Sequence, residues 1–174
     1  MWDFFETVRH RHSVRQYQDK TAIENEKLHA ILEMACAAPS AGDLQAYQIF
    51  VVHNQQLRDR LRQAAADQAF LSAAPVCLVF CADTERSAER FGDRGRDLYA
   101  LQDASIAATY AQLATVAAGM ASTWVGYFDE QQVTDLLALP AGLKPIAMLS
   151  IGYSAELPEP SPRRRMDEVI KTID

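Results

Sequence analysis

The segment RHRHSVR, residues 9 to 15, concentrates three arginines and two histidines in a chain that is acidic overall. The 174 residues carry 17 Lys and Arg against 23 Asp and Glu, a formal net charge of −6. Arginine binds phosphate oxygens two at a time, and the Ser13 hydroxyl adds a further donor. Arg11, Ser13 and Arg15 alternate, so in an extended segment they project to one side together. The residues alone leave two interpretations open: a clamp for a small anion, or a solvated basic helix end.

The other histidines, glycines and carboxylates indicate no further catalytic motif. The seven glycines permit neither a dinucleotide-binding G-x-G-x-x-G nor a P-loop, and G-x-S-x-G and H-E-x-x-H do not occur. His10 and His12 could hold a metal only if both rings faced one way, and the neighbouring arginines repel a cation. We therefore expect no metal site, and we name no catalytic side chain.

A second segment with binding potential is APSAGDLQAY, residues 38 to 47. Proline, serine, glycine and aspartate in this order predict a tight, well-defined turn whose backbone N–H groups are free to meet a ligand. The alternative is a connecting loop without a ligand.

Length and composition indicate a single globular domain. A chain of 174 residues can bury a substantial core, and 49% hydrophobic with 23% charged residues is ordinary for a globular protein. A pI near 5.2 argues against nucleic acid as a partner, because duplex binding normally requires a basic face. The anion expected at residues 9 to 15 is therefore small.

The cysteines and the longest uncharged segment bear on location. Three cysteines without a C-x-x-C pair fit a reducing, cytoplasmic environment. Cys77 and Cys81, four apart on an expected strand, share a face and are interpreted as core residues.

Residues 104 to 128 carry no charge and are long enough to span a bilayer. Because most of their apolar positions are alanines among polar residues, we expect a helix buried in the core or a subunit interface, and no membrane association.

Hydrophobic periodicity predicts alternating helices and strands. Helices are expected at 2–11, 24–37, 54–67, 98–118 and 129–139, and strands at 47–52, 75–82, 124–128 and 144–153. Asn54 and Asp129 are the expected N-caps of their helices, and Gly119 the end of the long one. Residues 83–97 are expected to form a surface loop with some helix. Prolines at 158, 160 and 162 favour an extended tail, either loose or laid across another subunit.

Several of these segments together resemble the nitroreductase family of flavoproteins. R-H-S-V-R (11–15), A-P-S-A-G-D-L-Q (38–45), the segment 102–128, LKPIAMLSIGY (143–153) and the arginine-bearing tail occur in that family's order over nearly the whole chain. The resemblance implies an α+β fold with a mixed, mostly antiparallel central sheet flanked by helices. It also implies one domain, residues 1–174, whose C-terminal arm (about 154–174) crosses to the partner of a homodimer with FMN at the interface.

The resemblance assigns roles to individual positions. The residues implied to hold the FMN phosphate and ribityl chain are Arg11, His12, Ser13 and Arg15, with Arg163 and Arg164 closing over the phosphate from the tail. The residues implied to line the flavin from the partner subunit are Pro39, Ser40, Ala41 and Gln45. Val125 and Gly126 match the place where a backbone N–H reaches flavin N5. Asp43 stands where the family commonly has asparagine, and its carboxylate can accept a hydrogen bond from flavin N3–H.

The implied activity is electron transfer from NAD(P)H, the co-substrate, through FMN to nitroaromatics, quinones or a similar small acceptor by a ping-pong mechanism. In such enzymes the cofactor performs the chemistry while the protein supplies position and electrostatics. Two alternatives remain: a module that binds or delivers flavin with incidental activity, and the same fold with another reaction such as dehalogenation or flavin fragmentation. The acceptor and the preference between NADH and NADPH stay open.

Overall fold

A four-stranded antiparallel sheet forms the centre of the computed structural model, which describes residues 3–156 and 158–173. The strands are β1 (Tyr47–Val52), β2 (Val76–Asp83), β3 (Ala121–Val125) and β4 (Leu143–Gly152), in the order β1-β2-β4-β3. An isolated parallel bridge between Ser13 and Ser122 adds the segment after the first helix to the β3 side. The expected α+β fold with a mixed, mostly antiparallel sheet is thus confirmed.

The central strand β2 is buried on both faces, which explains its uninterrupted apolar sequence. Cys77, Val79 and Cys81 point to one face, and Leu78 and Phe80 belong to the cluster on the other. Burial raises the pKa of both cysteine thiols to about 12, so they remain protonated. The prediction that these cysteines are core residues is confirmed.

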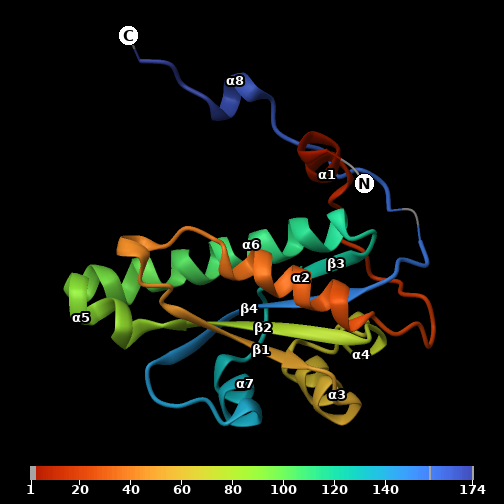
Figure 1. Cartoon of the computed structure of the whole chain (residues 1–174), viewed down its shortest axis with the longest axis horizontal. Coiled ribbons are helices and arrows are strands. Elements are labelled where there is room, and N and C mark those ends of the chain that lie inside the picture. The colour runs from red at the N-terminus through yellow and green to blue at the C-terminus, as the bar shows by residue number, and fades with distance from the viewer. Residues whose placement is uncertain (1–2, 157, 174) are drawn as a thin grey trace.

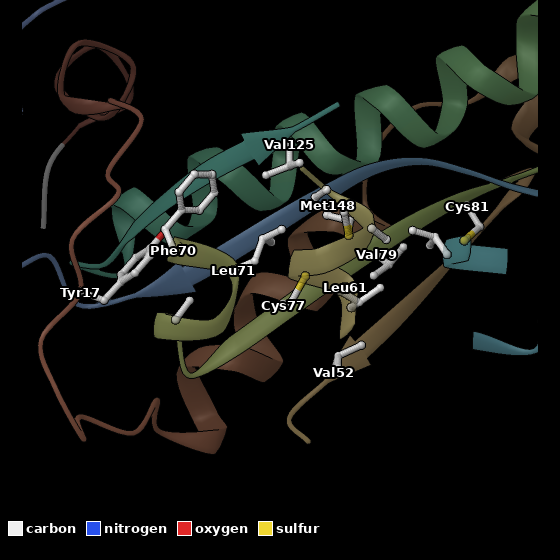
Figure 2. Close-up of a cluster of buried hydrophobic side chains, with 14 of the residues drawn as sticks. Tyr17, Val52, Leu61, Phe70, Leu71, Cys77, Val79, Cys81, Val125 and Met148 are labelled. Carbon is white, nitrogen blue, oxygen red and sulfur yellow. The ribbon is translucent and has the colours of Figure 1, made fainter. Parts of the chain in front are cut away.

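Helices cover the two faces of the sheet as separate layers (Figure 1). One layer contains α3 (Gln55–Ala64), α4 (Phe70–Ala73) and α7 (Glu130–Leu137), whose side chains Leu61, Phe70, Leu71 and Val133 pack on Cys77, Val79 and Met148. Figure 2 shows this cluster, with Tyr17 and Phe70 at its end and Val52 at its edge. The other layer contains α2 (Asn25–Cys36) and α6 (Ala100–Ala117).

Helix α6 contains most of the uncharged segment considered above as a membrane span. Its alanines 104, 107, 108 and 111 are fully buried, because a side chain of this size lets the helix lie close to the sheet and to α2. Within the described residues no helix is both long and apolar enough to cross a membrane.

Most element boundaries match the sequence pattern, and two do not. Asn54 and Asp129 cap α3 and α7 by accepting hydrogen bonds from the Leu57 and Gln132 N–H groups, as predicted. The loop expected at 83–97 is wrong: α5 (Thr84–Arg94) and a π-helical turn (Gly95–Tyr99) make it helical up to α6. Asp83 caps α5, and Gly92 absorbs the bend with a φ of 60°. The strand expected at 124–128 begins three residues earlier, directly after the turn at Gly119.

The two ends of the chain carry apolar side chains that the described residues leave exposed. Helix α1 (Phe4–His10) exposes Phe4, Phe5 and Val8. The C-terminal arm runs away from the sheet past α1 and contains the short helix α8 (Met166–Val169) (Figure 1). The exposed apolar side chains of the arm are Met166, Val169, Ile170 and Ile173.

Gly152 at the end of β4 is required by close packing. A Cβ at this position would lie 2.8 Å from Tyr17 Cδ1 and 2.8 Å from Pro75 Cδ. Tyr17 is itself fixed, because its hydroxyl is hydrogen-bonded to the Ser150 carbonyl at 3.1 Å and to the Ser150 hydroxyl at 2.8 Å. The ring therefore cannot withdraw without losing these buried bonds.

We expect Gly152→Ala to destabilise the fold by about 1–3 kcal/mol, the usual cost of overpacking, and to lower Tm by roughly 3–10 °C. Thermal unfolding followed by circular dichroism measures the change. Gly126→Ala is the matched control, because a Cβ there meets the Trp124 side chain at ordinary distances, 3.4 Å to Nε1 and 3.8 Å to Cδ1. Equal melting temperatures of the two variants would contradict the packing argument.

Candidate functional site

The basic segment is held in an extended conformation beside β3. The Val14 N–H donates to the Ser122 carbonyl at 3.2 Å, and the Thr123 hydroxyl donates to the Val14 carbonyl. Val14 is buried, whereas Arg11 and Ser13 keep part of their surface exposed. Helix α1 ends at His10, and the backbone is already extended at Arg11.

The chain after β4 forms the other side of this arrangement. The Ala155 N–H donates to the Gln16 carbonyl at 2.9 Å. The Glu156 carboxylate accepts from the backbone N–H groups of Arg15 at 2.6 Å and Gln16 at 3.1 Å. Glu156 thereby fixes the basic segment without neutralising an arginine side chain. Sequence analysis missed this role, since an isolated glutamate before a proline-rich tail carries no recognisable signal.

Arg163 lies close enough to Arg11 for its positive charge to act on the Arg11 guanidinium, and we call these two residues the cationic pair. The pKa of the Arg11 guanidinium is lowered, first by partial burial and then by the positive charge of Arg163. Arg163 Nη1 donates to the carbonyls of Ser161 at 3.1 Å and Pro162 at 3.2 Å. Within the described residues neither guanidinium has a carboxylate at ion-pair distance. Two neighbouring cations without a counter-charge create a positive electrostatic potential that favours the binding of an anion.

The other basic residues predicted for this site have different surroundings. Arg164 pairs with Glu168 at 3.5 Å and Arg165 with Asp167 at 2.5 Å, both within the arm. The Arg15 guanidinium lies 5.9 Å from the centre of the Phe70 ring, and His12 is half-buried. Of the tail arginines, Arg163 is the one placed beside the basic segment.

The predicted loop at 38–45 folds into a tight turn with unusual backbone angles. Gly42, Asp43 and Gln45 have φ values of 57°, 56° and 47°, in the left-handed region. The Ser40 hydroxyl accepts from the Gln45 N–H at 2.9 Å, and Gln45 Nε2 donates to the Cys36 carbonyl at 2.7 Å. Left-handed conformations of non-glycine residues cost free energy and cluster at functional sites.

Three side chains that sequence analysis did not assign hold this loop in place. Asp103 on α6 accepts from the Ala41 N–H at 2.8 Å. Arg86 and Arg90 on α5 donate to the carbonyls of Leu44 at 2.6 Å and Gly42 at 2.9 Å. Arg86 and Arg90 are four residues apart, so on a helix both side chains can reach residues 42–44. Because their segment was expected to be a loop, this spacing was not recognised as helical.

Asp103 is 2% exposed, and its Oδ2 has no hydrogen-bond partner within the described residues. Burial raises the pKa of this carboxyl, and the backbone N–H groups of Ala41 and Ala46 oppose the increase. Asp103 therefore anchors the loop from a position that is closed to solvent in the single chain.

A cavity of about 600 Å³ opens between this loop and the start of α6. Its lining residues are Pro39, Ser40, Ala41, Leu98, Tyr99, Leu101, Gln102, Asp103, Ser105 and Ile106. Its size suits a cofactor or drug-sized ligand, and its walls are largely apolar with a few polar groups. Pro39, Ser40 and Ala41, predicted to line a flavin, therefore do line a cavity.

Val125 and Gly126 lie where β3 ends. Val125 is 2% exposed, while Gly126 is exposed and has no positive φ. Backbone strain therefore does not explain a glycine here, and a small residue at the exposed strand end leaves its N–H accessible.

The predicted residues form two groups that one chain does not bring together. The loop at 38–45 is attached to Asp103 near the start of α6, whereas the basic segment is attached to Ser122, beyond its end. At 1.5 Å per residue, the 18-residue α6 is about 27 Å long. The cationic pair fits a phosphate and the cavity fits an aromatic ring, so the residues are suited to FMN, but in two separate halves.

Comparisons with known proteins show the family to which the chain belongs. The sequence profile of the nitroreductase family matches residues 8–70 and 65–153. A Thermus thermophilus protein named NADH dehydrogenase is 32% identical, covering 92% of this chain and 91% of its own. A Bacillus subtilis FMN reductase [NAD(P)H] is 28% identical, covering 90% of this chain and 68% of its own.

A solved structure, B. megaterium NfrA2, superposes with a TM-score of 0.90 at 27% identity, covering 98% of this chain and 74% of its own. The profile match includes the basic segment, the loop at 38–45 and the end of β3. The chain belongs to the nitroreductase family.

Proposed function

We propose that the protein is an FMN-dependent oxidoreductase that transfers electrons from NAD(P)H to a small acceptor such as a nitroaromatic or a quinone. The names of the Thermus and Bacillus relatives, an NADH dehydrogenase and an FMN reductase, support the same class of reaction. The geometry supports the cofactor, because the described residues include a cationic pair and a largely apolar cavity.

The cationic pair formed by Arg11 and Arg163 is the observation that carries this proposal. An FMN phosphate carries nearly two negative charges at neutral pH and forms charge-assisted hydrogen bonds with guanidinium groups. Such a phosphate would supply the counter-charge that neither arginine has within the described residues. The Ser13 hydroxyl is a further donor on the same extended segment.

We infer a homodimer in which each flavin site takes one group of residues from each chain. A two-fold axis near the middle of α6 places the start of one α6 beside the end of the other. The loop at 38–45 of one chain then approaches the basic segment and the β3 end of its partner. The exposed apolar side chains of α1 and of the arm, which includes Met166 and Ile170, suit burial against a second copy.

In this arrangement the residues of the chain bind and orient the cofactor. Arg11, Ser13 and Arg163 hold the phosphate, and the Gly126 region presents a backbone N–H to the ring. The partner's loop, anchored by Asp103, covers the ring and excludes water. When bound, FMN supplies the hydride acceptance and electron transfer, for which the chain itself offers no group.

The first test is the cofactor content and turnover of the purified protein. We expect a flavin absorption spectrum, release of about one FMN per chain on heating, and oxidation of NADH or NADPH that depends on a quinone or nitroaromatic acceptor. Bound FMN with negligible reduction at saturating NADH and NADPH would identify a flavin-binding module instead. A colourless protein that does not take up added FMN would contradict the cofactor assignment.

Complementation between two inactive variants tests whether the site is shared. Arg11→Glu places a carboxylate in the phosphate half, and Ala41→Phe fills the cavity in the loop half. We expect each homodimer to lose FMN affinity by about tenfold or more, the effect of about 1.4 kcal/mol or greater. A co-expressed heterodimer, isolated through two different affinity tags, should regain about half of the wild-type FMN content and activity, because one of its two sites is intact.

If the heterodimer binds as little FMN as the two variant homodimers, all contacts to one FMN come from one chain. This result would contradict the shared site. A wild-type heterodimer carrying the same two tags is the control for the tags and for the purification.

Asp43 provides a test through the flavin potential. A carboxylate near the ring disfavours the anionic reduced flavin, so Asp43→Asn should raise the FMN midpoint potential by roughly 20–90 mV, from about 1–4 kcal/mol of charge interaction. Asparagine also tolerates the left-handed φ of 56° at this position. Redox titration of the FMN-loaded protein measures the potential.

Asp135→Asn on α7 is the matched control, since it removes an exposed carboxylate on the opposite face of the sheet. An unchanged or lowered potential in Asp43→Asn would place Asp43 away from the flavin.

A further inference from the structure

A second cavity, of about 390 Å³, lies at the other side of the molecule from the loop at 38–45, beside the start of α3. Its walls come from the segment 18–22, the turn after β1, and the junction between α4 and β2; α3 and α4 lie together at this end of the sheet (Figure 1). It shares no lining residue with the predicted flavin site. Polar and charged side chains dominate its lining.

Arg58 is the central group of this cavity. It is only 6% exposed, and its guanidinium donates to the His53 carbonyl and to Gln55 Oε1, both of them neutral acceptors. Its Nε has no partner within the described residues. A guanidinium has five N–H donors, so most of its capacity is unused.

Arg58 has no carboxylate at ion-pair distance within the described residues, although the charge of Asp59 acts on it from farther away. The Asp59 carboxylate accepts instead from Gln55 Nε2 at 3.0 Å. The nearby Cys77 thiol stays protonated, because burial raises its pKa to about 12 despite the arginine. A buried cation without a neutralising partner is costly, unless a ligand provides the opposite charge.

The rest of the wall complements an anion. Lys20 adds a second cation, and the hydroxyl-bearing Thr21 and Ser72 line the same space. The first turn of α3 contributes the positive end of a ten-residue helix. Asp19 is the one carboxylate among the lining residues, so the two cations exceed the negative charge.

We propose that this cavity binds a small phosphate-type oxyanion, either inorganic phosphate or a phosphate monoester, separate from the phosphate of the flavin. The Arg58 guanidinium supplies a buried positive charge to which a phosphate is attracted, and Lys20 adds a second charge among the lining residues. The volume exceeds that of a phosphate ion, leaving space for the ester group.

Calorimetric titration of the FMN-loaded protein tests the proposal. We expect inorganic phosphate to bind saturably at one per chain in phosphate-free buffer, with the flavin spectrum unchanged so that displacement of FMN is excluded. Glycerol 3-phosphate and acetate are titrated in parallel. Tighter binding of the monoester identifies an ester as the ligand type, and tighter binding of inorganic phosphate identifies the free ion. Acetate binding as tight as phosphate would overturn the proposed specificity.

Variants at the cavity separate this site from general charge effects. Arg58→Met keeps the length of the side chain and should weaken phosphate binding by about tenfold or more, the effect of losing charged hydrogen bonds. Arg60→Met is the matched control, because Arg60 is an exposed arginine on the same helix and does not line this cavity. Equal phosphate affinity in these two variants would overturn the proposal.

A second variant covers the case in which Arg58→Met does not fold. Lys20→Asn removes the exposed cation and retains a residue that tolerates the φ of 56° at this position. We expect phosphate binding weakened several-fold, with FMN content and Tm unchanged. Unchanged phosphate affinity in Lys20→Asn, or no saturable binding by the wild type, would overturn the proposal.

Discussion

The backbone pairing of residues 13–18 is the constraint on which the phosphate half of the site depends. One side of this segment bonds to Ser122 and Thr123, and the other to residues 153–156. These bonds bring Arg11 near Arg163 although the two guanidinium groups repel each other. The hydrogen bonds and the packing of Val14 and Tyr17 offset the unfavourable free energy of that repulsion. The positive potential is therefore present before a ligand binds.

Helix α6 imposes the second constraint, because its length separates the two groups of binding residues. Its rigidity follows from buried alanines that lie close to the sheet and to α2. Asp103 near one end fixes the loop at 38–45, and the turn at Gly119 leads into β3 at the other. A single chain therefore keeps the two groups of predicted binding residues apart. A helix packed against its own copy about a two-fold axis is a simple way to complete both at once.

The sequence predicted those features whose causes are local. Helix caps at Asn54 and Asp129 and the strand at 47–52 depend on neighbouring residues, and the structure has them where expected. The segment 83–97 was misjudged because its glycines and charges are typical of loops, whereas Asp83 and the bend at Gly92 make it helical. The roles of Asp103 and Glu156 depend on contacts 62 and 141 residues apart in the chain, which no spacing rule reveals.

The distribution of charge connects the two anion sites with the acidic character of the whole chain. A net charge of −6 repels anions at long range, so binding must come from short-range groups that are fixed in position and partly withdrawn from water. Arg11 with Arg163, and Arg58 with Lys20, meet this condition in different ways: the first pair through two backbone segments held together, the second through one guanidinium buried at a helix start. In each pair one guanidinium donates to neutral acceptors, Arg163 to two backbone carbonyls and Arg58 to the His53 carbonyl and Gln55, and forms no ion pair within the described residues.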